Sequence, residues 1–199
     1  MKRLAVLASG GGTDLQSIID AVESGKICGE IVCVISDKEN AYALERAKKH
    51  SIRAEYVKRG ESDTLLSLLK SLSVDYVVLA GYLGILPEIL IKEYPYKIIN
   101  IHPSLIPSFC GMGFYGMRVH EAVYKRGVRF TGVTVHFVDE GADTGAIIKQ
   151  VVVEIDEEDT PEIIQRKVLE REHVLLPEVV GLLCSDKVLV ENGRVKIKK

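Results

Sequence analysis

Two polar side chains that could act on a carbonyl group stand two residues apart in this sequence. Asn100 and His102 open the run Asn-Ile-His-Pro-Ser-Leu-Ile-Pro, which follows an apolar, strand-like segment. Side chains two residues apart on an extended chain point to the same side. An amide and an imidazole that face one pocket can polarise a carbonyl group and move a proton. The alternative is a turn with a structural histidine, and the neighbouring partners favour the chemical interpretation.

An acidic loop could supply a charge for that histidine. Residues 139–145 read Asp-Glu-Gly-Ala-Asp-Thr-Gly and follow a predicted strand. A carboxylate close to His102 would favour the imidazolium form and raise the pKa of the ring. Taken alone, the pattern is more typical of a solvated acidic loop. We expect His136 to be buried and hydrogen-bonded in a strand and His120 to be exposed on a helix, and we assign catalysis to neither.

A glycine-rich turn near the start of the chain could bind an anion. Residues 4–8 are apolar, residues 9–12 read Ser-Gly-Gly-Gly, and a helical pattern begins at Leu15. Glycines allow a close approach of the backbone, and the free N–H groups at a helix N-terminus attract phosphate. The segment is neither a Walker loop nor a GxGxxG motif, because no Gly-Lys-Ser/Thr follows and Leu15 occupies the last glycine position. A tight strand–helix turn capped by Thr13 is the equally weighted alternative.

Short apolar runs alternate with helical patterns in the first half of the chain. The runs are rich in β-branched residues, as expected for strands that are buried on both faces. We predict strands at residues 4–8, 31–35, 54–57, 76–80 and 98–101, and helices at 15–24, 41–50, 63–72 and 87–93. This alternation predicts an α/β fold with a doubly wound, mostly parallel sheet and helices on both faces. Ligands of such sheets bind beyond the carboxyl ends of the strands.

The second half predicts longer strands, one long helix and a small hairpin. We expect strands at 128–138 and 146–154 and a helix at 118–126. Thr160 and Pro161 are typical of an N-cap and a first helical residue, so a long helix should follow them. Asn192 and Gly193 between apolar runs predict a terminal hairpin. Because we find no linker or repeat, we expect residues 1–199 to form one catalytic domain.

Composition and charge argue against several classes of protein. The chain is 47% hydrophobic and 27% charged, so it should bury a core without disulfides or metal. Its net charge of −2 argues against a nucleic-acid-binding surface. The four cysteines form no CxxC pair and fit no zinc template, so we expect free thiols in a reducing compartment. The apolar runs are too short for a signal peptide or a membrane span, so we expect a soluble, cytoplasmic protein with no membrane partner.

Five segments together resemble the glycinamide ribonucleotide formyltransferase family, the folate-dependent transformylases of purine synthesis. They are residues 8–16, 79–86, 100–107, 132–145 and the pair Glu172-His173. The resemblance spans nearly the whole chain, and the segments are specific as a set although none is specific alone. It implies the Rossmann-like fold of formyltransferases. It also implies that a formyl group passes from 10-formyltetrahydrofolate to the amine of glycinamide ribonucleotide, which gives formylglycinamide ribonucleotide and tetrahydrofolate.

The resemblance implies three catalytic residues. Asn100 would hold the formyl oxygen as it gains negative charge, and His102 would stabilise that charge and shuttle a proton. Asp143 would raise the pKa of His102 and help to organise the path of water or protons. The resemblance implies neither a metal nor a covalent enzyme intermediate.

The same resemblance assigns binding roles. The ribonucleotide site would comprise Gly12, Thr13, Asp14, Glu170, Arg171 and Glu172. The folate site would comprise Leu83, Gly84, Ile85, Leu86, Asn100, Asp139, Glu140, Gly141, Ala142, Asp143 and either Lys58 or Arg59.

Two positions depart from the family pattern. Asp14 replaces a frequent Asn, and Gly84 replaces a frequent Arg or Lys, which removes a side chain from the folate pocket. Because a carboxylate repels a phosphate, we expect the backbone N–H groups of the glycine turn to hold the phosphate. The Asp14 side chain should then turn away, either capping the helix or accepting a hydrogen bond from a ribose hydroxyl.

Three alternatives remain open. Formyltetrahydrofolate hydrolases share the pattern, but they usually carry an N-terminal regulatory domain and a His at the position of Pro103. Methionyl-tRNA formyltransferases share Asn-x-His, but they carry a C-terminal tRNA-binding domain that we do not expect here. A non-catalytic nucleotide-binding module would need only the glycine turn and would leave Asn100, His102 and Asp143 unexplained. The partners should be small-molecule substrates, and the chain should be a monomer or a homodimer.

Overall fold

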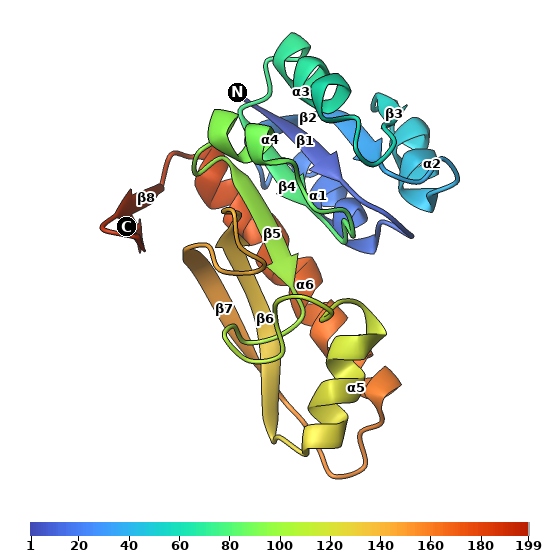
Figure 1. Ribbon diagram of the computed structural model, residues 1–199, viewed down its shortest axis with the longest axis vertical. Coiled ribbons are helices and arrows are strands. Elements are labelled where there is room, and N and C mark those ends of the chain that lie inside the picture. The colour runs from blue at the N-terminus through green and yellow to red at the C-terminus, as the bar shows by residue number, and fades with distance from the viewer. Residues whose placement is uncertain (199) are drawn as a thin grey trace.

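The structure, a computed structural model, describes residues 1–198 and is built on a seven-stranded sheet (Figure 1). Its strands are β1 (Lys2–Leu7), β2 (Gly29–Ser36), β3 (Ala54–Tyr56), β4 (Tyr76–Leu79), β5 (Ile98–His102), β6 (Phe130–Phe137) and β7 (Ile147–Glu154). The order across the sheet is β3-β2-β1-β4-β5-β6-β7. The strands β1 to β5 pair in parallel, whereas β6 is antiparallel to both β5 and β7. The predicted doubly wound, mostly parallel sheet is therefore confirmed.

Helices cover both faces of this sheet (Figure 1). They are α1 (Thr13–Glu23), α2 (Tyr42–Lys49), α3 (Ser62–Ser71), α4 (Glu88–Glu93), α5 (Met117–Arg126) and α6 (Pro161–Cys184). The helices α1, α2 and α6 pack in one hydrophobic cluster and α3 and α4 in another. A two-stranded hairpin of β8 (Val188–Glu191) and β9 (Arg194–Ile197) follows α6, as predicted from Asn192 and Gly193.

The strand β1 shows why the predicted runs are continuously apolar. Leu4 and Val6 belong to the cluster under α1 and α6, whereas Ala5 and Leu7 belong to the cluster under α3 and α4. All four side chains are fully buried. A strand that is covered on both faces cannot alternate between apolar and polar residues, and this explains the pattern.

Local signals at the helix ends are confirmed in α6. The Thr160 side chain accepts a hydrogen bond from the Ile163 N–H at 3.4 Å, and Pro161 is the first helical residue. The helix α6 continues through Pro177 to Cys184 as one element. Among the described residues, no helix combines the length and the apolar character that a membrane span requires.

The chain reverses its direction of winding between β1 and β4. The strands β2 and β3 extend the sheet from one side of β1, and β4 and β5 extend it from the other side. The segments that leave the carboxyl ends of β1 and β4 therefore diverge and leave a crevice between them. In open α/β sheets, ligands bind at this crevice.

Candidate active site

A cavity of about 1060 Å³ lies where β1, β4 and β5 end. Its wall is formed by residues 9–14, 80–85, 100–103 and 111–116, and by Asp37, Lys38, Arg59, His120, Asp143, Gln165, Leu169 and Glu172. The glycine turn, the Asn-x-His pair and one residue of the acidic loop thus meet in one cavity, although they are far apart in the sequence.

Asn100 and His102 both lie in β5 and line this cavity, as their spacing predicts. His102 is only 4% exposed. Its Nε2 lies 2.9 Å from the Phe109 carbonyl oxygen, to which it donates a hydrogen bond. Its Nδ1 lies 3.6 Å from Oδ2 of Asp143, and the Gly111 N–H donates to the same oxygen at 2.9 Å. The imidazole ring is therefore held between a carbonyl and a carboxylate.

The electrostatics of His102 differ from the expected rise in pKa. Burial of the ring lowers the pKa of His102 below its usual range, and the hydrogen bond to Phe109 and the charge of Asp143 raise it only in part. Asp143 thus acts in the expected direction, but desolvation outweighs it. Burial raises the pKa of Asp143, but its contact with His136, the charge of His102 and the hydrogen bond from the Gly111 N–H bring it below its usual range. The carboxyl group is therefore ionised beside the ring.

The expectation that His120 is exposed is wrong. His120 lies in α5, is only 3% exposed and lines the cavity. Burial, together with the charge of His102, lowers the pKa of His120 to about 4. The sequence holds a signal for the burial of His120. Val119 and Val123 stand four residues apart and form an apolar stripe on the helix, and His120 lies beside this stripe.

The glycine turn leads directly into α1. Gly12 is the N-cap residue in the left-handed conformation, with φ of 69°, and the helix begins at Thr13, so the alternative in which Thr13 caps the helix is wrong. Arg46 of α2 holds the turn by donating from Nε to the Gly11 carbonyl at 2.7 Å. A Cβ at Gly12 would lie 2.9 Å from the Ala43 side chain, so this close packing requires glycine. The first N–H groups of α1 have no partner within the helix and can bind an anion.

Asp14 faces a second buried carboxyl group. Asp14 is 9% exposed and Glu172 of α6 is 8% exposed, and both line the cavity. Burial raises the pKa of Asp14 to about 6. Burial, together with the charge of Asp14, raises the pKa of Glu172 well above its usual range. Both carboxyl groups therefore keep their protons to a higher pH than exposed carboxyl groups do.

The expected cap from the Asp14 side chain is not formed, because within the described residues no side chain caps α1. Instead, Oδ1 of Asp14 is buried without a hydrogen-bond partner, 3.7 Å from Nε2 of His173, which is also unpartnered. Burial, together with the charge of Arg46, lowers the pKa of His173. The neutral ring gives Asp14 no ionic partner.

The predicted folate segment lines the cavity only in part. Leu83, Gly84 and Ile85 belong to its wall, whereas Leu86 is buried in the core under α3 and α4. A Cβ at Gly84 would lie only 2.6 Å from the ring of Tyr82. The Tyr82 ring therefore occupies the space that a side chain at position 84 would need, and sequence reasoning did not single out this residue.

The remaining predicted residues divide between the wall of this cavity and the surface outside it. Arg59, paired with Asp37, belongs to the wall, whereas Lys58 is exposed outside it. Glu170 and Arg171 are exposed on α6, outside the wall. Residues 139–141 instead line a second cavity of about 630 Å³, and Ala142 belongs to neither wall. The acidic loop thus contributes only Asp143 to the main cavity.

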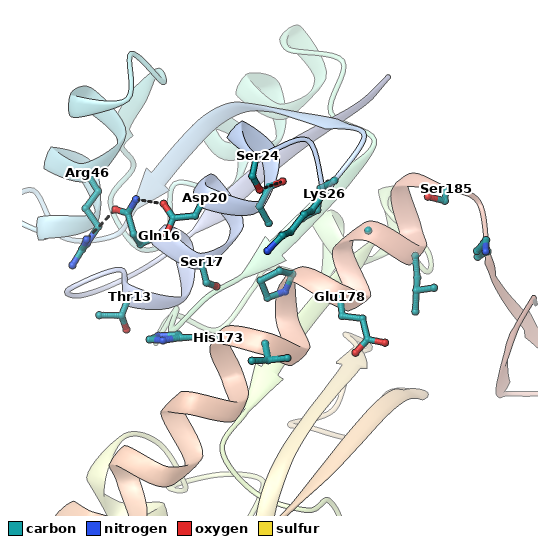
Figure 2. Close-up of a pocket in the computed structure, with 17 residues that line it drawn as sticks. Thr13, Gln16, Ser17, Asp20, Ser24, Lys26, Arg46, His173, Glu178 and Ser185 are labelled. Carbon is teal, nitrogen blue, oxygen red and sulfur yellow. Dashed lines mark hydrogen bonds between the residues drawn. The ribbon is translucent and has the colours of Figure 1, made fainter.

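A separate groove of about 840 Å³ runs between α1 and α6 (Figure 2). On one side, Arg46, Gln16 and Asp20 are joined by hydrogen bonds. Thr13 lines both this groove and the main cavity, and His173 lines the groove. Within residues 1–198, no group of three or more His, Cys, Asp or Glu side chains is placed to hold a metal ion.

Comparison with known proteins gives similarities over most of this chain. A family model described as "Formyl transferase" matches residues 2–180. The phosphoribosylglycinamide formyltransferase of Haemophilus influenzae is 44% identical over 205 residues, which covers 100% of this chain and 91% of that protein. The chloroplastic phosphoribosylglycinamide formyltransferase of Arabidopsis thaliana is 40% identical over 195 residues, which covers 94% of this chain and 67% of that protein.

Solved structures show the same similarity. Glycinamide ribonucleotide transformylase 1 from Symbiobacterium toebii matches with a TM-score of 0.94 and 37% identity, covering 100% of this chain and 95% of that one. A formyltetrahydrofolate deformylase from Pseudomonas syringae matches with a TM-score of 0.91 and 29% identity, covering 100% of this chain and 66% of that one. The same fold thus occurs in a transferase and in a deformylase, so the substrates must be argued from the site.

Proposed function

The chain belongs to the formyl transferase family, and we propose that it transfers the formyl group of 10-formyltetrahydrofolate to the amine of glycinamide ribonucleotide. The products would be formylglycinamide ribonucleotide and tetrahydrofolate, in a step of purine synthesis. The observation that carries this proposal is the position of Asn100 and His102, with Asp143 beside them, in a cavity that also contains the glycine turn. One cavity thus offers groups for a carbonyl reaction and groups for a phosphate.

The reaction would proceed by direct attack. The amine nitrogen bonds to the formyl carbon, and the carbonyl electron pair moves onto the oxygen. An N–H of Asn100 stabilises this oxyanion, together with His102 once the ring is protonated. The attacking nitrogen loses a proton, the folate nitrogen gains one, and the bond between that nitrogen and the formyl carbon breaks.

His102 is suited to carry that proton. Because burial lowers the pKa of the ring, it is mostly neutral in the free protein at neutral pH and can accept a proton from the attacking amine. The ionised Asp143, 3.6 Å away, then stabilises the imidazolium that forms. A group that is neutral before the reaction and stabilised as a cation during it can serve both as base and as acid.

The two substrates would occupy different parts of the cavity. We assign the phosphate to the backbone N–H groups of Gly12, Thr13 and Asp14, supported by the partial positive charge of the helix N-terminus. Glu172, in the same wall, would contact the rest of the ribonucleotide. Glu170 and Arg171 lie outside the wall, so this proposal does not include them.

The folate would lie along the apolar side of the cavity. The pterin would pack on residues 83–85, and Arg59 would reach the acidic tail of the folate in place of Lys58, because Arg59 lines the cavity. Asn100 and Asp143 would border the formyl group. The proposed site needs no metal.

Release of tetrahydrofolate tests this function. The purified full chain is incubated with 10-formyltetrahydrofolate in the presence and in the absence of glycinamide ribonucleotide. Release that requires the ribonucleotide supports the transferase. Release without it indicates a hydrolase, and no release under either condition indicates a binding module; both results contradict the proposal.

A further inference from the structure

We propose that His136 is a positioning residue that holds the Asn100 amide in place for the reaction, an inference that rests on the proposed function. His136 lies in β6 directly opposite Asn100 of β5 in the antiparallel ladder. It is only 2% exposed and lies outside the wall of the cavity. His136 therefore acts through Asn100 and does not touch a substrate itself.

One hydrogen bond of His136 requires a proton on Nδ1. Nδ1 lies 2.8 Å from the carbonyl oxygen of Phe137. A carbonyl oxygen can only accept, so Nδ1 must donate, and a neutral ring then has a lone pair on Nε2. Nε2 lies 3.2 Å from Nδ2 of Asn100, and in this neutral form it accepts an N–H from the amide.

This contact orients the amide. If the Asn100 amide were rotated by half a turn, its oxygen would meet the lone pair of His136, and two acceptors repel each other. With one N–H bound to His136, the second N–H and the amide oxygen remain for groups in the cavity. A donor whose direction is set before the substrate binds is what an oxyanion requires, because no reorganisation is then needed during the reaction.

The backbone around His136 is adapted to this arrangement. The ladder between β6 and β7 has an irregular register between Val135 and His136, and such bulges redirect side chains near active sites. A Cβ at Gly145 would lie 1.8 Å from the Phe137 carbonyl oxygen. Only glycine at position 145 therefore leaves that carbonyl in the place where it accepts the Nδ1–H of His136.

A His136 ring with a proton on Nε2 would make different contacts. Nε2 of His136 also lies 3.5 Å from Oδ1 of Asp143. If Nε2 carried a proton, it would donate to that carboxylate, and the Asn100 amide would have to turn its oxygen towards the ring. The protonation state of Nε2 therefore separates the proposed arrangement from its alternative.

The first test is a measurement of the ring nitrogens by ¹⁵N NMR in the unmodified protein at neutral pH. We expect His136 with a proton on Nδ1 and none on Nε2. A proton on Nε2, in the other tautomer or in the imidazolium, would overturn the proposal. Because this measurement requires no substrate, it remains decisive for the His136–Asn100 contact even if the chain transfers no formyl group and the proposed function fails.

The second test is a double-mutant cycle. We expect His136→Leu to lower kcat by about 10- to 100-fold, less than the 10²- to 10³-fold typical for loss of an oxyanion donor, with KM for both substrates within about threefold. In an Asn100→Ala background, the same change should cost less than about threefold, because the amide that His136 orients is gone. Independent, multiplicative effects of the two changes, or a change in KM alone, would contradict the positioning role.

Thr131→Val is the matched control for this cycle. Thr131 is buried in the same strand, and its hydroxyl has no hydrogen-bond partner. We expect this variant to keep kcat, which shows that a substitution inside β6 does not by itself slow the reaction. If His136→Leu fails to fold, the tautomer measured in the unmodified protein decides the question.

Discussion

The Asp14 carboxyl group is a buried group that should destabilise the folded protein when it ionises. It is 9% exposed, its Oδ1 has no hydrogen-bond partner, and it faces Glu172 across the cavity wall. Asn has nearly the same shape and carries no charge. Asp14→Asn should therefore remove an electrostatic cost without leaving a cavity.

The size of the effect follows from the pKa. Burial raises the pKa of Asp14 from 3.8 to about 6. Between these values the folded chain binds a proton that the unfolded chain has lost, so the contribution of Asp14 to stability falls as the pH rises through this window. At about 1.4 kcal/mol per pKa unit, the cost reaches at most about 3 kcal/mol at neutral pH. The stability gained by Asp14→Asn should grow by about 2 kcal/mol between pH 4 and pH 7.

Urea unfolding of both proteins at several pH values measures this difference. Asp20→Asn is the matched control, because Asp20 lies on the same helix and is exposed, and its stability difference should not grow in this way. A difference between Asp14→Asn and the unmodified protein that is flat from pH 4 to pH 7 would refute the reasoning. So would a variant that is less stable than the unmodified protein at pH 7.

The same variant tests how the phosphate is bound. If backbone N–H groups hold it, removal of one negative charge should leave KM for the ribonucleotide level or lower it, most clearly at low salt. A tenfold or larger rise in this KM, with folding intact, would show that the Asp14 carboxylate itself binds the substrate.

Two further substitutions test the catalytic pair. His102→Ala should lower kcat by about 10²- to 10⁴-fold and change KM less. The control is His50→Ala, which lies outside the wall of the cavity and should keep the rate. Near-normal turnover of a folded His102→Ala protein would show that the ring takes no part in the mechanism. In the unmodified protein the charge of Asp143 raises the pKa of His102, so Asp143→Asn should lower that pKa further. Asn tolerates the positive φ of position 143, so the backbone should keep its conformation. NMR titration of His102 measures this change, and an unchanged pKa would exclude an electrostatic role for Asp143.

Features that depend on neighbours in the sequence could be predicted without the structure. The apolar runs indicated strands covered on both faces, and the two-residue spacing of Asn100 and His102 placed both in one cavity wall. The cap at Thr160 could also be predicted, because it depends on residues within one helical turn. In each case the physical cause acts over a few residues, so the pattern of residue types is sufficient.

Features that depend on contacts between distant segments required the tertiary structure. The role that we propose for His136 depends on the antiparallel register that sets it opposite Asn100. His120 is buried because α5 turns that side towards the cavity, and the raised pKa values of Asp14 and Glu172 exist only because α1 and α6 pack together. Burial and charge interactions depend on distance in space, and folding sets that distance between residues far apart in the chain. The residue types alone therefore determined which chemistry was available, and the packing decided which groups meet and in which protonation state.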